Sequence, residues 1–507
     1  MGTSNTQREN DHKHNNEEAN PGGTSIEAFF AASVILITGA TGFLGKALLE
    51  KLLRSCPRIS TIYVLIRPKK DLTMEERFQA LLDSTVFDRI RRECPSAFSK
   101  IIPVMGDVSQ PDLGLSEQDR LMLTQKVNIV FHGAATVRFN EPLKVAMTLN
   151  TRGTERVIEL CTGMINLISF IHVSTAYSNP EQAEVDEIIY STKIMPEIAI
   201  NMCENLDDET LAILEEKLKG RHPNTYTLTK RLAELIILKK GTSLPVAIVR
   251  PSIVCAAYRE PYPGWIDNTS GLTGLIVQIS RGTLKSVYCK KNLKVDIIPV
   301  DFVVDTLVCA AWHNVMRRTN TIKIYNCVSG ARNPITWGKF GYYLNKYAVE
   351  SPTKLAVWYP GFNYTPSLLF HKISTVLFHH VPAFIIDIVL KFRGEKPMML
   401  KLSKRFARIA STGYYFANNE WNFLSDNVNQ LSECVKTVTD SSNFNVDIKT
   451  VDWSTYVHGY ILGIRKYILK DELETLTQAR NRLSKLYWFQ RSMQALMALL
   501  LIKLILR

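Results

Sequence analysis

The chain has 507 residues, of which 46% are hydrophobic and 21% are charged, and this predicts a globular protein of two or three domains. Its formal net charge of +13 favours an anionic partner, but the absence of zinc-finger spacing and of an RNA-binding aromatic signature argues against nucleic acid. The nine cysteines are scattered and form no CxxC pair, so the sequence predicts neither a disulfide framework nor a metal site.

The first 30 residues are predicted to form a disordered polar tail. The stretch is rich in Asn, Glu, Gly and His and offers little apolar surface to bury. It also lacks the apolar core of a secretory signal peptide. The folded part is therefore expected to begin at about residue 31.

Apolar β-branched runs alternate with helical stretches in the first half of the chain. Helices are predicted at 46–53, 75–82 and 154–162, and strands at 33–37, 62–66, 101–105, 127–131, 168–173 and 246–249. Strands this continuously apolar are typical of a parallel sheet that is covered on both faces. The predicted fold class is α/β, a doubly wound parallel Rossmann sheet, in a domain at residues 31–335.

A glycine-rich turn follows the first predicted strand, in the run TGATGFLGK at 38–46. Its GxxGxxG spacing suits a sharp turn, a close approach of the backbone to a pyrophosphate, and a helix packed on the sheet. The helix that follows offers its first N–H groups to phosphate. The residues expected at the dinucleotide are Gly39, Thr41, Gly42, Phe43, Leu44 and Gly45.

The end of the second strand distinguishes NADP from NAD. An NAD site places an acidic residue there, but this sequence has Arg67 and Lys69, with no acid before Asp71. Arg67 is suited to a ribose 2′-phosphate, and the cofactor is therefore predicted to be NADPH. After the third strand, Asp107 is placed to bind the adenine amino group. After the fourth strand, three small residues allow the cofactor to lie against the backbone, namely Gly133, Ala134 and Ala135.

A tyrosine and a lysine, Tyr226 and Lys230, are four residues apart and share one face of a predicted helix. The ammonium is expected to lower the pKa of the tyrosine, so that the phenol can exchange a proton with a carbonyl oxygen during hydride transfer. Ser174 or Thr175, at the end of the fifth strand, is expected to polarise the same carbonyl.

A second, mostly helical domain is predicted at residues 336–475. Within it, residues 367–390 are strongly apolar but carry three histidines, a lysine, a proline and an aspartate. This composition does not suit a clean membrane span. It suits an amphipathic or re-entrant segment, or a buried helical hairpin.

The last segment, 476–507, is predicted to be a membrane-associated helix. It ends in an apolar run that reaches the length of a membrane span if Arg491 and Lys503 snorkel to the two interfaces. The alternative is an amphipathic helix that docks on the protein or on a partner.

The chain resembles the fatty acyl-CoA reductases, a family of extended short-chain dehydrogenases with a second domain of their own. The resemblance spans about residues 33–472. It rests on TGATGFLGK (38–46), VLIRPK (64–69), HGAATVRF (132–139), HVSTAY (172–177), YTLTK (226–230), VRPSIV (249–254), PGWIDN (263–268), DIIPVD (296–301), HHVPAFIIDIVL (379–390), GEKP (394–397), NNEWNF (418–423), FNVDIKTVDW (444–453) and GIRKYIL (463–469). PGWIDN and the second-domain motifs favour this family over sterol dehydrogenases and sugar epimerases. The resemblance also implies cofactor contacts from Val108, Pro251 and Ile253, and from Tyr226 and Lys230.

The resemblance implies a reaction in which a long-chain acyl-CoA and two NADPH give a primary fatty alcohol, CoA and two NADP. Thr175 or Ser174 and Tyr226 would hold the thioester carbonyl, and a bound aldehyde would be reduced in turn. A membrane partner is implied at the endoplasmic reticulum or the peroxisome, with the catalytic domain facing the cytosol, and a homodimer is left open. The alternatives are a sterol or hydroxysteroid dehydrogenase and a non-catalytic, lipid-binding relative.

Overall fold

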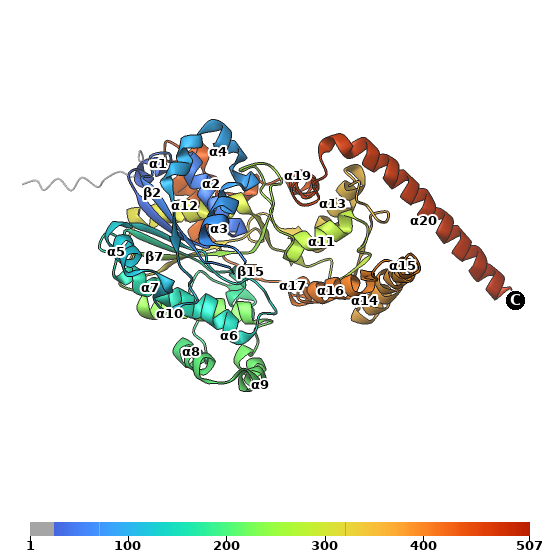
Figure 1. Ribbon diagram of the computed structural model, residues 1–507, viewed down its shortest axis with the longest axis horizontal. Helices are drawn as coiled ribbons and strands as arrows, with labels where there is room; N and C mark the ends of the chain where they lie inside the picture. Colours follow the sequence, from blue (N-terminus) through green and yellow to red (C-terminus); the bar gives the residue numbers. More distant parts are fainter. Residues whose placement is uncertain (1–24, 70, 320, 507) are drawn as a thin grey trace, which may run out of the picture.

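The computed structural model describes residues 25–69, 71–319 and 321–506. A seven-stranded, fully parallel sheet lies at its centre, in the order β3-β2-β1-β4-β5-β7-β12 (Figure 1). The chain reverses direction across the sheet between β1 and β4, which places a ligand-binding crevice at the carboxyl ends of these two strands. The strands are β1 Val34–Thr38, β2 Thr61–Ile66, β3 Ile101–Met105, β4 Ile129–His132, β5 Ser169–Val173, β7 Val246–Pro251 and β12 Lys323–Cys327.

Helices cover both faces of the sheet, as predicted for a doubly wound fold. Alternate residues of β1 belong to different cores, with Ile35 and Ile37 in one and Leu36 in the other. The first core lies under α2 (Phe43–Ser55) and α12 (Val300–Met316), and the second under α7 (Gly153–Thr162) and α10 (Thr225–Lys240). Further helices of this part of the chain are α3 Met74–Leu82, α4 Asp88–Glu93, α5 Glu117–Lys126, α6 Leu143–Ala146, α8 Pro196–Asn205, α9 Asp208–Lys219 and α11 Gly271–Ser280.

The predicted disordered tail is too long. Residues 1–24 lie outside the described part of the chain, but Ile26–Phe30 form a short helix, α1, whose Ile26 and Phe30 are fully buried. The carboxylate of Asp440 accepts hydrogen bonds from the backbone N–H groups of Ile26 and Glu27, at 3.0 and 2.9 Å. The prediction failed at 26–30 because the partner of this helix lies more than 400 residues away in the sequence.

The chain from α13 (Trp337–Glu350) onward forms a mostly helical region beside the sheet (Figure 1). One part of it returns to the sheet domain, since β15 (Asn422–Phe423) pairs with β6 (Glu184–Val185) and the side-chain amide of Asn326 donates to the Leu424 carbonyl at 2.8 Å. The helices of this region are α13 Trp337–Glu350, α14 Leu368–Thr375, α15 Val381–Phe392, α16 Met399–Ser411, α17 Tyr414–Asn418, α18 Asp426–Lys436, α19 Trp453–Gly463 and α20 Leu476–Ile505.

The apolar segment predicted at 367–390 is an exposed helix. A π-helical turn at Val376–His380 joins α14 to α15. Within the described residues, Leu368–Phe392 is the one helix found to be long and apolar enough to cross a membrane, and only 6% of its apolar stretch is buried. The alternative of a buried helical hairpin is therefore wrong, because most of these side chains have no protein around them.

The last helix, α20, has two different halves. Near its start, Ala479 and Leu483 are buried and the Arg482 guanidinium donates to the Ala356 carbonyl at 2.7 Å. Its far half extends away from the rest of the molecule (Figure 1).

Candidate active site

The glycine-rich turn after β1 is packed too tightly to admit side chains. Gly39 has φ +81°, and a Cβ there would lie 2.8 Å from the backbone of Gly133, at the end of β4. A Cβ on Gly45 would lie 2.2 Å from the Gly39 carbonyl oxygen. Helix α2 then begins after Gly42, and no side chain caps it, so its first N–H groups are available to a phosphate.

The PGWIDN motif lies between this turn and the helical region. Trp265 stacks on Phe43 with ring centroids 5.0 Å apart, and Asp267 pairs with Lys46 at 2.8 Å. On its other side, a Cβ on Gly463 of α19 would lie 1.7 Å from the Gly264 carbonyl oxygen. The motif therefore links α19 to the start of α2 through close contacts on both of its sides.

The ends of β2 and β3 bring two of the predicted cofactor residues together. The Arg67 guanidinium lies 3.8 Å from the Asp107 carboxylate. Sequence reasoning missed Arg77 on α3, which donates to the Arg67 carbonyl and, at 3.3 Å, to Thr41 Oγ1 of the glycine turn. Burial and the positive charge of Arg67 lower the pKa of Arg77. Arg77 lies ten residues after Arg67 on the next helix, and no sequence motif marks this contact.

Two other predicted cofactor residues lie differently. Lys69 is exposed and its backbone bridges to Leu72. Val108 is buried, and its carbonyl accepts a hydrogen bond from Arg156 at 3.0 Å.

The residues at this edge fit a dinucleotide. The backbone cradle excludes side chains at Gly39 and Gly45, and this lets a ligand lie close to the backbone. Two guanidiniums stand at the far end of the cradle, beside the β2 terminus.

Tyr226 and Thr175 meet at the end of β5. A hydrogen bond from the Thr175 hydroxyl lowers the pKa of Tyr226, but burial outweighs it and raises that pKa to about 12. Lys230 is buried, its ammonium donates to the Val173 carbonyl at 2.8 Å, and burial lowers its pKa to about 8. The expected lowering of the tyrosine pKa by the lysine is thus wrong, because desolvation dominates both groups.

Ser174, the other predicted hydroxyl, is engaged elsewhere. It donates to the Glu234 carboxylate at 2.5 Å, and Glu234 pairs with the fully buried Arg250 at 2.7 Å. Of the two hydroxyls, the structure therefore brings only Thr175 to Tyr226.

A buried polar network behind the site was also missed. The Asn150 amide donates to Thr229 Oγ1 at 2.9 Å and its carbonyl oxygen accepts from the backbone of Thr136 at 2.8 Å. Thr154 donates to the Asn150 backbone carbonyl at 2.7 Å and contacts the His132 ring at 3.1 Å. This network fixes α10, which carries Tyr226, against the loop after β4. Nothing in the local sequence marks Asn150.

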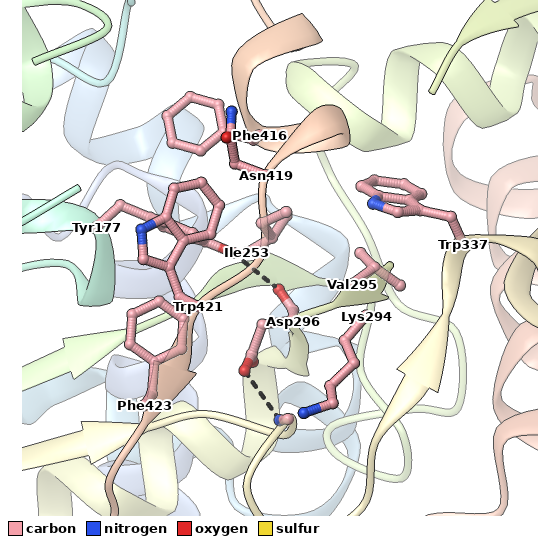
Figure 2. Close-up of a pocket in the computed structure, with 11 residues that line it drawn as sticks. Tyr177, Ile253, Lys294, Val295, Asp296, Trp337, Phe416, Asn419, Trp421 and Phe423 are labelled. Atoms are coloured by element: carbon pink, nitrogen blue, oxygen red, sulfur yellow. Dashed lines mark hydrogen bonds between the residues drawn. The ribbon is translucent and has the colours of Figure 1, made fainter. Parts of the chain in front are cut away.

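Aromatic rings from distant parts of the chain line a pocket beside Tyr226. Phe139 lies 5.8 Å from the Tyr226 ring and 5.4 Å from that of Phe416, and Phe416 lies 5.1 Å from Tyr177. Phe416 and Tyr177 thus line a narrow hollow that opens to solvent (Figure 2). It is lined by Tyr177, Ile253, Lys294, Val295, Asp296, Gly330, Trp337, Phe416, Asn419, Trp421 and Phe423.

Two side chains of the helical region bind one carbonyl of the sheet domain beside this pocket. The Trp421 indole and the Tyr415 hydroxyl donate to the Pro180 carbonyl, at 3.1 and 3.2 Å. Ile253, predicted at the cofactor, lines the pocket, whereas Pro251 ends β7 beside it. The helical region thus completes a pocket that the sheet domain begins.

The parallel sheet, the glycine turn and the Thr175–Tyr226–Lys230 cluster at one sheet edge together define a dinucleotide-binding reductase of the extended short-chain type. Two family models agree. An NAD-binding model described as "Male sterility protein" matches residues 37–307, and a second of the same description matches 378–471. The cofactor is therefore a nicotinamide dinucleotide.

The chain belongs to the fatty acyl-CoA reductase family. It is 41% identical to fatty acyl-CoA reductase 1 of Mus musculus and 40% identical to that of Homo sapiens, each over 91% of this chain and 90% of the relative. It is 39% identical to fatty acyl-CoA reductase 2 of Mus musculus, over 91% of this chain and 89% of the relative.

Two solved structures share the fold. One is the terminal R domain of the myxalamid PKS-NRPS pathway, with a TM-score of 0.57 at 21% identity, covering 87% of this chain and 92% of that one. The other is the reductase domain of a nonribosomal peptide synthetase from Mycobacterium tuberculosis, with a TM-score of 0.57 at 18% identity and the same coverage.

Proposed function

We propose that the protein reduces a long-chain acyl-CoA to a primary fatty alcohol with NADPH and releases CoA. The observation that carries this proposal is the Thr175–Tyr226 pair, which lies between the dinucleotide cradle and the aromatic pocket. The membership in the family, whose relatives carry the name fatty acyl-CoA reductase, supports the substrate. The balanced reaction consumes one acyl-CoA, two NADPH and two protons and yields one alcohol, one CoA thiol and two NADP⁺.

The chain's own groups handle the oxygen and the protons. Thr175 and Tyr226 donate hydrogen bonds to the thioester carbonyl and stabilise the negative charge that develops on its oxygen. Bound NADPH would supply hydride chemistry here, with one hydride from each of two successive NADPH molecules. When the C–S bond breaks, the thiolate leaves and takes up a proton, and Tyr226 later protonates the alkoxide. Lys230 holds the ribose and replenishes the Tyr226 proton.

Water has to be kept from the bound aldehyde. Phe139 and Phe416 stack in series beside Tyr226 and provide an apolar wall. Burial raises the pKa of Tyr226 to about 12, so the phenol is neutral at physiological pH. It therefore carries the proton that the alkoxide takes up.

We infer NADPH rather than NADH from two guanidiniums. Arg67 and Arg77 lie together at the end of β2, where the ribose 2′-position of a dinucleotide falls, and Arg77 also contacts Thr41 of the glycine turn. Two positive charges suit a 2′-phosphate and have no counterpart on a plain ribose. We also propose which residues bind the cofactor at this edge of the sheet. They are Gly39, Thr41, Gly42, Phe43, Leu44, Gly45, Arg67, Asp107, Gly133, Ala134 and Ala135.

We further propose a membrane location, at the endoplasmic reticulum or the peroxisome, with the catalytic part facing the cytosol. The exposed apolar helix Leu368–Phe392 supports the membrane association, and the far half of α20 offers a second contact. The proposed organisation is a reductase domain that starts at α1 and ends at 335, a helical domain at 336–475 and a membrane-associated tail at 476–507.

The test combines product analysis with Tyr226→Phe. The wild-type protein should convert palmitoyl-CoA to hexadecanol with two NADPH oxidised per alcohol. Tyr226→Phe should lower that rate by about 100- to 10,000-fold, the range of general acid catalysis, with NADPH binding intact in a calorimetric titration. The control is Tyr63→Phe, in β2, which removes a hydroxyl far from Thr175.

Each alternative function has its own result in this assay. Oxidation of a sterol substrate with NADP⁺, and no alcohol from palmitoyl-CoA, would identify a hydroxysteroid dehydrogenase. Binding of acyl-CoA without any turnover in the wild-type protein would identify a non-catalytic relative. Full activity in Tyr226→Phe would remove that residue from the mechanism.

A further inference from the structure

The helix Leu368–Phe392 forms an apolar ridge at the outer end of the helical region (Figure 1). Fourteen of its large apolar side chains are more than a third exposed, up to 88% at Phe392. They are Leu368, Leu369, Phe370, Ile373, Val376, Leu377, Phe378, Val381, Phe384, Ile385, Ile386, Ile388, Val389 and Phe392. A contiguous apolar surface of this size marks a site of association.

Two histidines in the first half of the ridge face the protein. His371 contacts Ser286 Oγ at 2.9 Å and the Tyr414 hydroxyl at 2.7 Å. His379 Nε2 accepts a hydrogen bond from the backbone N–H of Lys285 at 3.0 Å. These histidines thus fasten one face of the helix to the catalytic body.

The polar side chains in the second half hold α16 in place. His380 contacts Ser403 of α16 at 3.0 Å. The Asp387 carboxylate accepts hydrogen bonds from the backbone N–H groups of Met398, Met399 and Leu400, at 2.7–2.9 Å. Asp387 is therefore the cap of the α16 N-terminus. Four of the groups that interrupt the apolar sequence are used within the protein, namely His371, His379, His380 and Asp387, whereas Lys372 is exposed.

The neighbouring helix α16 supplies a basic stripe. Lys401, Lys404, Arg405 and Arg408 are exposed and recur at the spacing of one helix face. Residues 368–411 contain eight Lys and Arg against two acids, Asp387 and Glu395, so this segment contributes +6 of the net charge of +13. An apolar ridge flanked by a basic helix matches the acyl and phosphate layers of an anionic bilayer.

The contacts that hold the ridge against the protein determine its orientation at the bilayer. A spanning helix has lipid or membrane-embedded protein on every side, but His371 and His379 hold this helix against β9 (Ser286–Tyr288) and the residue before it, in the catalytic body. The ridge can therefore enter only the outer layer of one leaflet, with its axis along the surface.

We propose that α14, α15 and α16 form an in-plane docking surface for an anionic lipid bilayer, and that this surface presents the membrane to the aromatic pocket. The second clause rests on the proposed function. It is supported by chain continuity, since α16 ends at Ser411 and α17 begins at Tyr414, which contacts His371, and Phe416 of α17 lines the pocket. An acyl chain that leaves the bilayer at the ridge meets this pocket first.

The test uses the full-length protein in vesicle flotation. The lipids are pure phosphatidylcholine, or phosphatidylcholine with a third of phosphatidylserine. The wild-type protein should bind the anionic vesicles more tightly, and the triple variant Lys404→Glu, Arg405→Glu, Arg408→Glu should lose at least about tenfold of that affinity. The matched control, Lys126→Glu, Lys217→Glu, Lys449→Glu, changes the net charge equally at exposed sites elsewhere and should retain the affinity.

A second variant tests the ridge itself. Phe378→Ser with Phe384→Ser should weaken binding to both kinds of vesicle at least about tenfold, because two large side chains no longer enter the leaflet. Unchanged binding in both variants would overturn the proposal and assign membrane attachment to α20. A change from dimer to monomer in light scattering, with vesicle binding intact, would also overturn it, since the ridge would then be a contact between two copies.

Turnover separates this proposal from the proposed function. Both variants should reduce octanoyl-CoA in solution like the wild-type protein and lose activity only towards palmitoyl-CoA held in anionic vesicles. Loss of vesicle binding with full palmitoyl-CoA activity would refute the delivery route and leave the reductase activity standing. A wild-type protein that binds vesicles by the ridge but reduces no acyl-CoA would refute the proposed function instead.

Discussion

The central sheet and the α14–α15 helix are built from the same kinds of apolar side chain, but the sheet buries them and the helix exposes them. In the sheet, Ile35, Val64 and Phe131 are at most 1% exposed. In the helix, Phe378 and Phe392 are 58% and 88% exposed. Apolar sequence alone therefore does not predict burial. The sheet obtains its apolar surroundings from the chain itself, and the helix has to obtain them from outside.

The largest expected effect contrasts one phenylalanine from each region. Phe131→Ala, in β4, should lower the free energy of unfolding by about 3–5 kcal/mol, because it leaves a cavity in a closed core. Phe392→Ala should change it by less than about 0.5 kcal/mol. Chemical denaturation of both variants in detergent-free buffer checks the contrast, and a large loss in Phe392→Ala would mean that the ridge is already covered.

The next effect concerns the joint between the two regions. Gly463→Ala places a Cβ 1.7 Å from the Gly264 carbonyl oxygen, so that α19 and the PGWIDN loop have to move apart. We expect a fall in Tm of about 5 °C or more and weaker cofactor binding, since Trp265 supports Phe43. Gly413→Ala is the control, because its Cβ comes no closer than 3.4 Å to another atom. Equal melting temperatures for the two variants would show that the joint adapts.

A smaller effect is expected at the cofactor end of the sheet. Arg67→Ala or Arg77→Ala should raise the KM for NADPH about 10- to 100-fold through loss of a charge-assisted hydrogen bond, and should leave the KM for NADH nearly unchanged. Arg89→Ala, at a half-buried arginine of α4 that pairs with Glu93, serves as the control for general loss of positive charge. If both cofactors are affected equally, the two arginines have only a structural role.

The smallest effect is a pH dependence set by burial in the sheet domain. Burial lowers the pKa of Lys230 to about 8, so its ammonium is lost as the pH rises through that value. We expect kcat/KM for a soluble acyl-CoA to be constant below about pH 8 and to fall up to tenfold per pH unit above it. Burial also lowers the pKa of Lys285 to about 8, which makes Lys285→Arg the matched control. A falling limb that disappears in Lys285→Arg would contradict the assignment to Lys230.

The sheet was largely predictable because its strands are continuous apolar runs between turn residues. The six predicted strands all exist, displaced by at most two residues at either end. The seventh, β12, was missed because its sequence, KIYNC, mixes polar and apolar residues and becomes a strand through its pairing with β7. The side-chain N–H groups of its Asn326 donate to the carbonyls of Val185 and Leu424, which no local pattern reveals.

The predicted site residues cluster because parallel strands end at one edge, and that much follows from topology. The pKa values of the site residues did not follow from the topology. Whether the pKa of Tyr226 rises or falls depends on how completely the surrounding chain removes water. The Lys230 ammonium donates its hydrogen bond to the Val173 carbonyl. Phe416 and Trp421 enter the pocket from more than 180 residues beyond Tyr226, a contact that only the folded chain makes.

The contact between α1 and Asp440 limits how far the chain can be shortened at its beginning. Removal of residues 1–30 would leave the Asp440 carboxylate without its backbone donors and open the space that Ile26 and Phe30 fill. Because the segment around Asp440 follows α18, which packs on β12 and α12, damage there would spread to the edge of the sheet. A truncated form suitable for crystallisation should therefore begin no later than Ser25.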